Sequence, residues 1–255
     1  MAASTEKTKR ALAVDFVELA RSVFGEALES VTVYGSFLKA TFTPGTSDVN
    51  VLVIVGEGHE RALRELGRRG KRLLRSHRIT PLVLTRREFV TSADVFPMEY
   101  LDIMDTHEVL HGPDVTTELE ISRSNLRHET EHQLRGSLVT LRQLAVAAGR
   151  PRPFRKLLLR RRLEEWYGSL AAILRGLLRL HGVTVVPQAS DELVREINRV
   201  LGLEPGPILE LLACRQGECP DSVELIDGLL ERLARLVEIV DAGPSGGGDA
   251  AKGSS

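Results

Sequence analysis

The chain has 255 residues, of which 42% are hydrophobic and 27% charged, as in ordinary globular proteins. This length suffices for one large domain or two small ones, and two cysteines are too few for a disulfide framework. The net charge of −1 does not indicate nucleic-acid binding. No apolar run approaches the roughly 18 residues of a membrane-spanning helix, and the first residues lack the apolar core of a signal peptide. We therefore expect a cytoplasmic protein with no membrane partner.

The first part of the chain predicts a helix followed by two strands. Residues 1–8 are small and polar, so we expect them to be disordered. Apolar residues recur at helical spacing from Lys9 to Leu28 and predict an amphipathic helix beside a sheet. A short β-branched strand follows at 31–34. A second strand at 49–55 is almost continuously apolar, which is typical of a strand covered on both faces.

The next segment alternates helices and strands. A basic helix is predicted at 59–76, where the charged cluster at 68–72 is typical of a solvated helix face, with phosphate contact as the alternative. A third strand at 79–84 contains Pro81, which places that strand at a sheet edge or near its own start. A capping-box pattern at Thr85 opens a short helix, and a further helix and strand are predicted up to residue 111.

Beyond residue 114 the patterns are helical only. This part is predicted to form an all-α helical-bundle domain at 115–242, followed by a flexible Gly-rich tail at 243–255. The helices are expected at 117–147, 154–181, 190–201, 206–214 and 221–240.

The residues between the first two strands suggest phosphate chemistry. Gly35 and Ser36 follow the first strand directly, and a glycine there lets the backbone approach a ligand closely. Asp48 stands at the head of the second strand and offers a hard oxygen ligand of the kind that Mg²⁺ prefers. Lys39 and Ser47 are close enough in sequence to join a phosphate site.

This stretch resembles the signature of the nucleotidyltransferase superfamily, which includes polymerase beta and the aminoglycoside nucleotidyltransferases. Gly35, Ser36 and Asp48 match the pattern, whereas Asn50 stands where the superfamily has a second carboxylate. The likeness is closest to uncharacterised bacterial nucleotidyltransferase-domain proteins, which share patterns like 47–50, 81–85 and 94–102. It implies an α/β domain with a small mixed sheet at 9–114, followed by the helical domain.

The resemblance also implies a ligand set. Nucleotidyl transfer in the superfamily uses two Mg²⁺ ions, so Asp48 and Asn50 become the catalytic and metal positions. Gly35, Ser36, Lys39 and Ser47 become the nucleotide-binding positions. The third carboxylate of the superfamily has no counterpart at 79–85. One charge at 4 Å from another is worth about 4 kcal/mol at an effective dielectric constant near 20, so a missing carboxylate weakens metal binding strongly.

Two functions therefore stand side by side. The first is a binding or regulatory protein that keeps a nucleotide or phosphate pocket with weak or no catalysis, because its metal triad is degraded. The alternative is an active nucleotidyltransferase that moves a nucleoside monophosphate from a magnesium-bound nucleoside triphosphate to a hydroxyl of a small molecule, a protein or RNA. The sequence identifies neither the acceptor of the second function nor a protein partner for the first.

A second motif points to different chemistry. His128, Glu129 and His132 form the HExxH pattern of zinc metallopeptidases on a predicted helix. Its flanks are polar and charged, and no third zinc ligand stands out downstream. A zinc hydrolase is therefore a remote alternative, and a polar helix face is the simpler interpretation.

Overall fold

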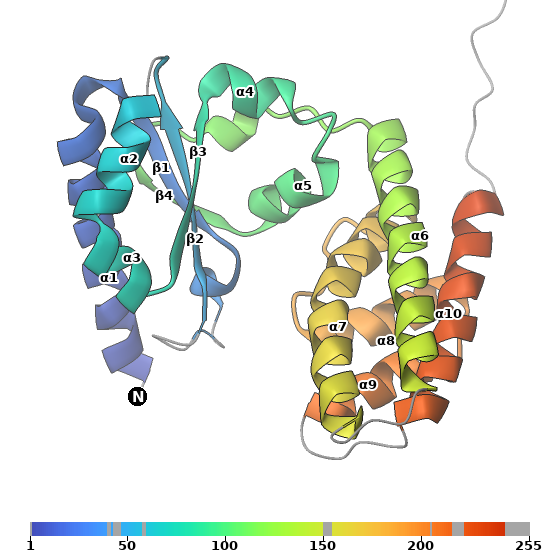
Figure 1. Cartoon of the computed structure of the whole chain (residues 1–255). Coiled ribbons are helices and arrows are strands. Elements are labelled where there is room, and N and C mark those ends of the chain that lie inside the picture. Colours follow the sequence, from blue (N-terminus) through green and yellow to red (C-terminus); the bar gives the residue numbers. More distant parts are fainter. Residues whose placement is uncertain are drawn as a thin grey trace, which may run out of the picture. The chain divides into compact units, whose positions relative to one another are not determined.

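The structure is a computed structural model that describes residues 2–39, 42, 47–57, 60–149, 155–204, 206–215 and 222–242 (Figure 1). It divides into two compact units, Met1–Ile121 and Ser122–Ser255. The division lies later than the predicted boundary after residue 114, because Val115, Leu119 and Ile121 pack into the core of the first unit. The predicted tail at 243–255 and Cys219 lie outside the described residues.

The first unit contains a mixed four-stranded sheet with the order β3-β2-β1-β4. β1 (Leu28–Tyr34) is antiparallel to both β2 (Val49–Val55) and β4 (His107–His111), whereas β2 and β3 (Ile79–Thr85) are parallel. The predicted mixed-sheet α/β fold is therefore confirmed. β3 is an edge strand, as Pro81 predicts, since proline cannot donate a hydrogen bond to a second neighbour.

One face of the sheet packs against α1 (Ala2–Phe24), α2 (Glu60–Arg69) and α3 (Lys71–Ser76), as Figure 1 shows. α1 begins at Ala2, so most of the segment predicted to be disordered is helical. Its alanine, glutamate and lysine residues favour helix, and they extend a helix that is already packed. The single helix predicted at 59–76 is broken at Gly70, where a Cβ would approach Leu19 Cδ2 to 2.8 Å.

The other face packs against α4 (Arg86–Thr91), α5 (Pro97–Asp105) and η3 (Val115–Glu118), with Phe89, Leu52 and Ile54 in the core. The predicted capping box opens α4. The Thr85 hydroxyl accepts from the Glu88 N–H at 3.1 Å, and the Thr85 N–H donates to Glu88 Oε2 at 2.7 Å.

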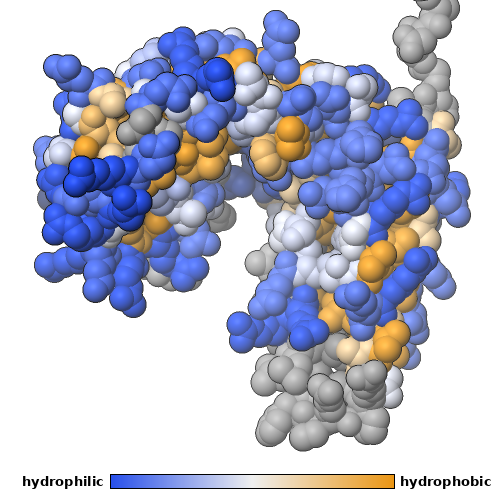
Figure 2. Space-filling model, turned by 45° about the horizontal axis from the view of Figure 1, so that its top comes forward, coloured by the Kyte–Doolittle hydropathy of each residue, from blue (hydrophilic) through white to orange (hydrophobic). Residues whose placement is uncertain are grey.

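The surface of the first unit is largely hydrophilic where α1 to α3 lie, as Figure 2 shows. The basic cluster predicted at 68–72 belongs to this surface. Arg68 is 74% exposed and donates to Glu65 Oε1 at 2.7 Å on the same helix. The cluster therefore behaves as a solvated helix face.

The second unit is all helical over its described residues. It consists of α6 (Arg123–Ala148), α7 (Arg155–Leu180), α8 (Ser190–Leu201), α9 (Pro207–Arg215) and α10 (Ser222–Ala242). α6 begins later than predicted because the Ser122 hydroxyl caps it, accepting from the Ser124 N–H at 3.2 Å. Among the described helices of the whole chain, none combines the length and hydrophobicity that crossing a membrane requires.

Candidate functional site

The Gly-Ser turn joins β1 to a short helical turn, η2 (Gly35–Leu38). Gly35 has φ +75°, a conformation that glycine adopts without strain, and its N–H donates to the Thr106 carbonyl at 3.2 Å. A Cβ at this position would meet Asn50 Nδ2 at 3.5 Å, which is ordinary contact. The turn therefore needs glycine for its backbone conformation and not for lack of space.

Ser36 ties this turn to the start of β2. Its hydroxyl donates to the Asp48 carbonyl oxygen at 2.8 Å, so the structure brings together Gly35, Ser36 and Asp48. Lys39 and Ser47 lie at the two ends of the intervening loop, of which only Phe42 is described in between. The Lys39 carbonyl accepts from Lys9 Nζ at 3.3 Å.

A row of polar residues crosses the sheet at the same end. The strand register aligns Thr80 with Asn50, Asn50 with Tyr34, and Tyr34 with His107. Burial raises the pKa of Tyr34 above its ordinary value, with a smaller contribution from Tyr100, so its hydroxyl is protonated at neutral pH. The row places Asn50 between an uncharged threonine and an uncharged tyrosine.

Sequence reasoning missed Arg78, which lies directly before β3. Because β2 and β3 are parallel with Val49 opposite Ile79, Arg78 stands beside Asp48. Its Nε donates to Asp48 Oδ1 at 2.7 Å, and the Val49 N–H donates to its carbonyl at 3.1 Å. The signal was a cation immediately before the third strand, but its partner depends on a strand register that the sequence does not reveal.

Lys9 is a second cation that sequence reasoning did not place near the turn. Its Nζ lies 5.6 Å from the ring centre of Phe37 and 5.3 Å from that of Phe42. Both distances are within the range of cation–π attraction. α1 therefore helps to hold the loop that follows the Gly-Ser turn.

The residues at this end of the sheet do not fit the two Mg²⁺ ions that the resemblance implies. Asp48 contributes one negative charge, which the Arg78 guanidinium at 2.7 Å offsets, and Asn50 contributes a neutral oxygen. Within the described ranges, no three His, Cys, Asp or Glu side chains cluster closely enough to hold a metal. Such a donor set lacks the negative charge that two hard divalent cations require.

Glu88 does not supply a missing ligand. Its carboxylate accepts from Thr85, whose strand partner is Val55 at the far end of β2 from Asn50. At about 3.3 Å per residue, five residues separate the two ends by about 16 Å.

His107 closes the polar row through a network with Asp114. Its Nδ1 faces the Ile103 carbonyl at 3.1 Å, and its Nε2 faces Asp114 Oδ2 at 3.1 Å. Carbonyl and carboxylate oxygens only accept, so the two ring nitrogens hold His107 between the end of α5 and Asp114. Asp114 also accepts from the Thr116 N–H at 2.9 Å and the Thr116 hydroxyl at 2.7 Å.

We expect Asp114→Asn to lower the free energy of unfolding by about 1 kcal/mol at pH 7, because charge-assisted hydrogen bonds are lost from a partly exposed group. Burial alone would raise the pKa of Asp114, but the hydrogen bonds from Thr116 and His107 outweigh it, and the pKa is lowered. A carboxyl group whose pKa is lower in the folded state contributes its full stabilisation above its unfolded-state pKa of about 4. This stabilisation is lost as the pH falls through the folded-state pKa. Denaturant titrations should therefore show the two proteins converging below pH 4, and a constant difference down to pH 2 would contradict the assignment.

The HExxH pattern lies on α6 with both histidines exposed. Thr130 between them is fully buried, and Glu131 pairs with Arg135 at 3.0 Å. The helix therefore turns Thr130, and not the two histidines, toward the core of the bundle. No third candidate ligand lies near them within the described part of the chain, so this arrangement does not form a zinc site.

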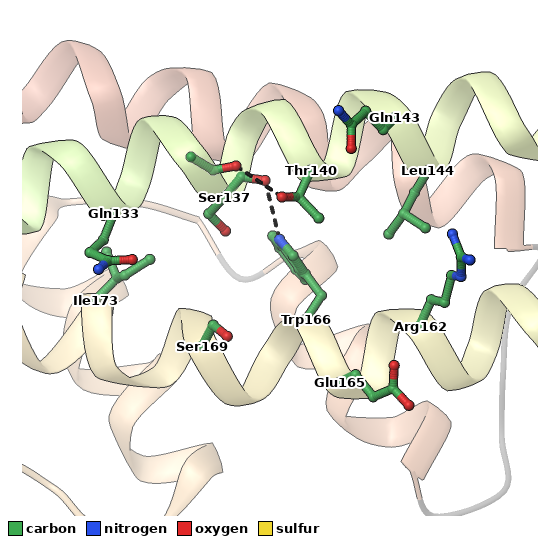
Figure 3. A pocket seen from close by; sticks show the side chains of 11 residues that line it. Gln133, Ser137, Thr140, Gln143, Leu144, Arg162, Glu165, Trp166, Ser169 and Ile173 are labelled. Atoms are coloured by element: carbon green, nitrogen blue, oxygen red, sulfur yellow. Dashed lines mark hydrogen bonds between the residues drawn. The ribbon is translucent and has the colours of Figure 1, made fainter.

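The helical unit contains a cavity of about 540 Å³ between α6 and α7 (Figure 3). Ser137 and Ser169 point toward each other across it. Glu165, which also lines it, accepts from Arg161 at 3.0 Å. The Trp166 indole N–H donates to the Ser137 carbonyl at 3.2 Å. Hydroxyl and amide groups make this a polar cavity, and none of the predicted nucleotide-site residues lines it.

Comparison with known proteins identifies the fold. No protein-family model matches the chain, and no curated protein matches its sequence. Among solved structures, the chain is similar to spectinomycin adenyltransferase AAD(9) from Enterococcus faecialis, whose crystal structure contains ATP and spectinomycin. The TM-score is 0.50 at 15% sequence identity, over 87% of this chain and 98% of the other. The comparison confirms the predicted fold: the chain shares the fold of this adenyltransferase, with an α/β unit followed by a helical one.

Proposed function

We propose that the α/β unit binds the phosphates of a nucleoside triphosphate at the Gly35-Ser36 turn and serves a binding or regulatory role with little or no nucleotidyl transfer. The proposal rests on the charges around Asp48. This single carboxylate lies beside the neutral Asn50 and is paired with Arg78 at 2.7 Å. The metal triad of the superfamily is, in this proposal, degraded.

Three features support phosphate as the ligand. The backbone at Gly35 has φ +75°, so no side chain stands between the turn and a ligand, although the Gly35 N–H itself donates to the Thr106 carbonyl. Ser36 fixes this turn against the start of β2. The similar structure of AAD(9) contains ATP, which supports a nucleotide as the source of the phosphates.

The alternative is an active enzyme that transfers a nucleoside monophosphate from a magnesium-bound triphosphate to a hydroxyl group. The similar protein AAD(9) is itself an adenyltransferase, and this favours retaining the alternative. Pyrophosphate release separates the two functions. Steady release that depends on Asp48, with water or an added hydroxyl compound as the acceptor of the nucleoside monophosphate, would establish an enzyme.

Binding is tested by calorimetric titration with ATP, GTP, CTP and UTP, each with and without Mg²⁺. We expect Gly35→Asp to weaken nucleotide binding at least about 30-fold, because a carboxylate beside the phosphates repels them. Gly35→Asn is the matched control, since it has the same size and the same tolerance of positive φ but no charge. We expect it to bind at least tenfold more tightly than Gly35→Asp.

The outcomes of this titration are distinct. Binding by the wild type that Gly35→Asp loses would support the proposed pocket. Absence of binding to all four nucleotides would overturn it. Equal binding by the Asp and Asn variants would place the phosphates away from the turn.

A further inference from the structure

The Arg78 side chain occupies a specific place at the end of the sheet. β2 and β3 run parallel, so the residues before them, Asp48 and Arg78, emerge at the same edge. Arg78 Nε donates to Asp48 Oδ1 at 2.7 Å, and Ser36 donates to the Asp48 carbonyl at 2.8 Å. A cation is therefore linked through Asp48 to the Gly-Ser turn.

The backbone of Arg78 argues against a purely structural role. Its φ of +52° makes it the only residue other than glycine with a positive φ among the described residues. It follows the end of α3 at Ser76, where glycine is the residue that best adopts this conformation. A side chain here costs about 1 kcal/mol relative to glycine.

The ion pair with Asp48 does not offset this cost. The Arg78 and Asp48 side chains are 52% and 57% exposed, and pairs this exposed contribute little to stability. An unfavourable residue held in a strained conformation at the proposed phosphate site indicates a role in function and not in folding.

The guanidinium has donors to spare. Arginine has five N–H donors in a rigid fork, of which the Asp48 bond at 2.7 Å uses one. The remaining donors match the oxygens of a phosphate in spacing and in charge. Asp48 and Arg78 together carry no net charge, and Asn50 and Thr80 add none, so this edge attracts a divalent cation weakly.

We propose that Arg78 takes the place of the divalent cation, so that the site binds a phosphate-bearing ligand without a metal. Asp48 then acts as a positioning residue that orients the guanidinium toward the Gly-Ser turn. The ligand class is a polyphosphate, either inorganic or as part of a nucleotide. This inference rests on the proposed function and specifies how its site binds the anion.

The test is Arg78→Gly in the full chain, titrated with inorganic tripolyphosphate and with ATP in the presence of EDTA. We expect binding of both probes to fall at least tenfold, because the phosphates lose a cation. We expect the free energy of unfolding to stay the same or to rise, because glycine relieves the positive φ. Arg75→Ala removes an exposed charge from the neighbouring α3 and controls for net charge. It should bind as the wild type does.

Comparing the two probes identifies the source of the phosphates. Binding of both shows that the polyphosphate chain is recognised, and binding of ATP alone shows that the nucleoside is needed as well. Either result supports the inference if the Arg78→Gly variant no longer binds the probe. Wild-type binding that appears only when Mg²⁺ is added, or that Arg78→Gly retains, would overturn it while leaving the nucleotide pocket in place. Absence of wild-type binding under all conditions would instead overturn the proposed function, and the inference with it.

Discussion

Gly112→Ala is expected to destabilise the α/β unit by about 4 kcal/mol, which is at the severe end for a single substitution. Gly112 follows β4 with φ +75°, and a Cβ there would lie 1.9 Å from the Glu29 carbonyl oxygen. The obstacle is backbone of β1, so no side chain can rotate out of the way. The neighbouring hydrogen bond from the Ser30 hydroxyl to the Pro113 carbonyl, at 2.8 Å, holds the same two segments together. Relief therefore requires β1 and β4 to separate.

Gly25→Ala is the matched control for this substitution. Gly25 also has a positive φ, +58°, but a Cβ there meets nothing within 4 Å. It should cost only about 1 kcal/mol, from backbone strain alone. Hydrogen exchange of the β1 and β4 amides in the full chain measures the destabilisation by each substitution as a loss of protection. Similar protection in the two variants would mean that the chain after β4 moves freely.

The double substitution Asn50→Asp with Arg78→Gly is expected to create Mg²⁺ dependence. It adds one negative charge and removes one positive charge at the end of β2, where Asp48 already lies. Each unit charge at 4 Å is worth about 4 kcal/mol at an effective dielectric constant near 20, before desolvation. We expect Mg²⁺ to tighten ATP binding by the double variant at least tenfold, measured by calorimetry with and without the ion.

The single variants divide this effect between the two positions. Asn50→Asp alone adds a carboxylate but leaves the competing guanidinium, so it should respond to Mg²⁺ less than the double variant does. Arg78→Gly alone frees Asp48 without adding a charge, and it should also respond weakly. A double variant as indifferent to Mg²⁺ as the wild type would show that these residues do not surround the phosphates.

Much of the fold could be predicted where local chemistry decides it. The strand at 49–55 was predicted with its observed bounds because an apolar run, broken only by Asn50, lies between Asp48 and Gly56. Pro81 predicted that β3 lies at an edge or that the proline lies near the strand's start, and β3 is an edge strand. The capping box at Thr85 fixed the start of α4. These elements depend on backbone donors, polar caps and hydrophobic burial, all of which the sequence shows directly.

The candidate site could be predicted only in part. The spacing of Gly35, Ser36 and Asp48 around two adjacent strands predicted that they would lie together, and the Ser36 hydrogen bond to the Asp48 carbonyl links them. Arg78 could not be predicted, because its position opposite Asp48 depends on the register between two parallel strands. The Asp114–His107 network depends in the same way on tertiary contacts, since it joins β4 to the η3 turn. Contacts between elements are set by packing of the whole unit, which a single sequence does not specify.

The most direct test of this account is the dissociation constant of ATP for the wild-type chain, measured once in EDTA and once in millimolar Mg²⁺. An arginine that replaces the metal predicts binding in both conditions, with constants that agree within about threefold, since the ion has no net negative site to occupy. Binding that appears only with Mg²⁺ would contradict this account and would favour the active, metal-dependent nucleotidyltransferase.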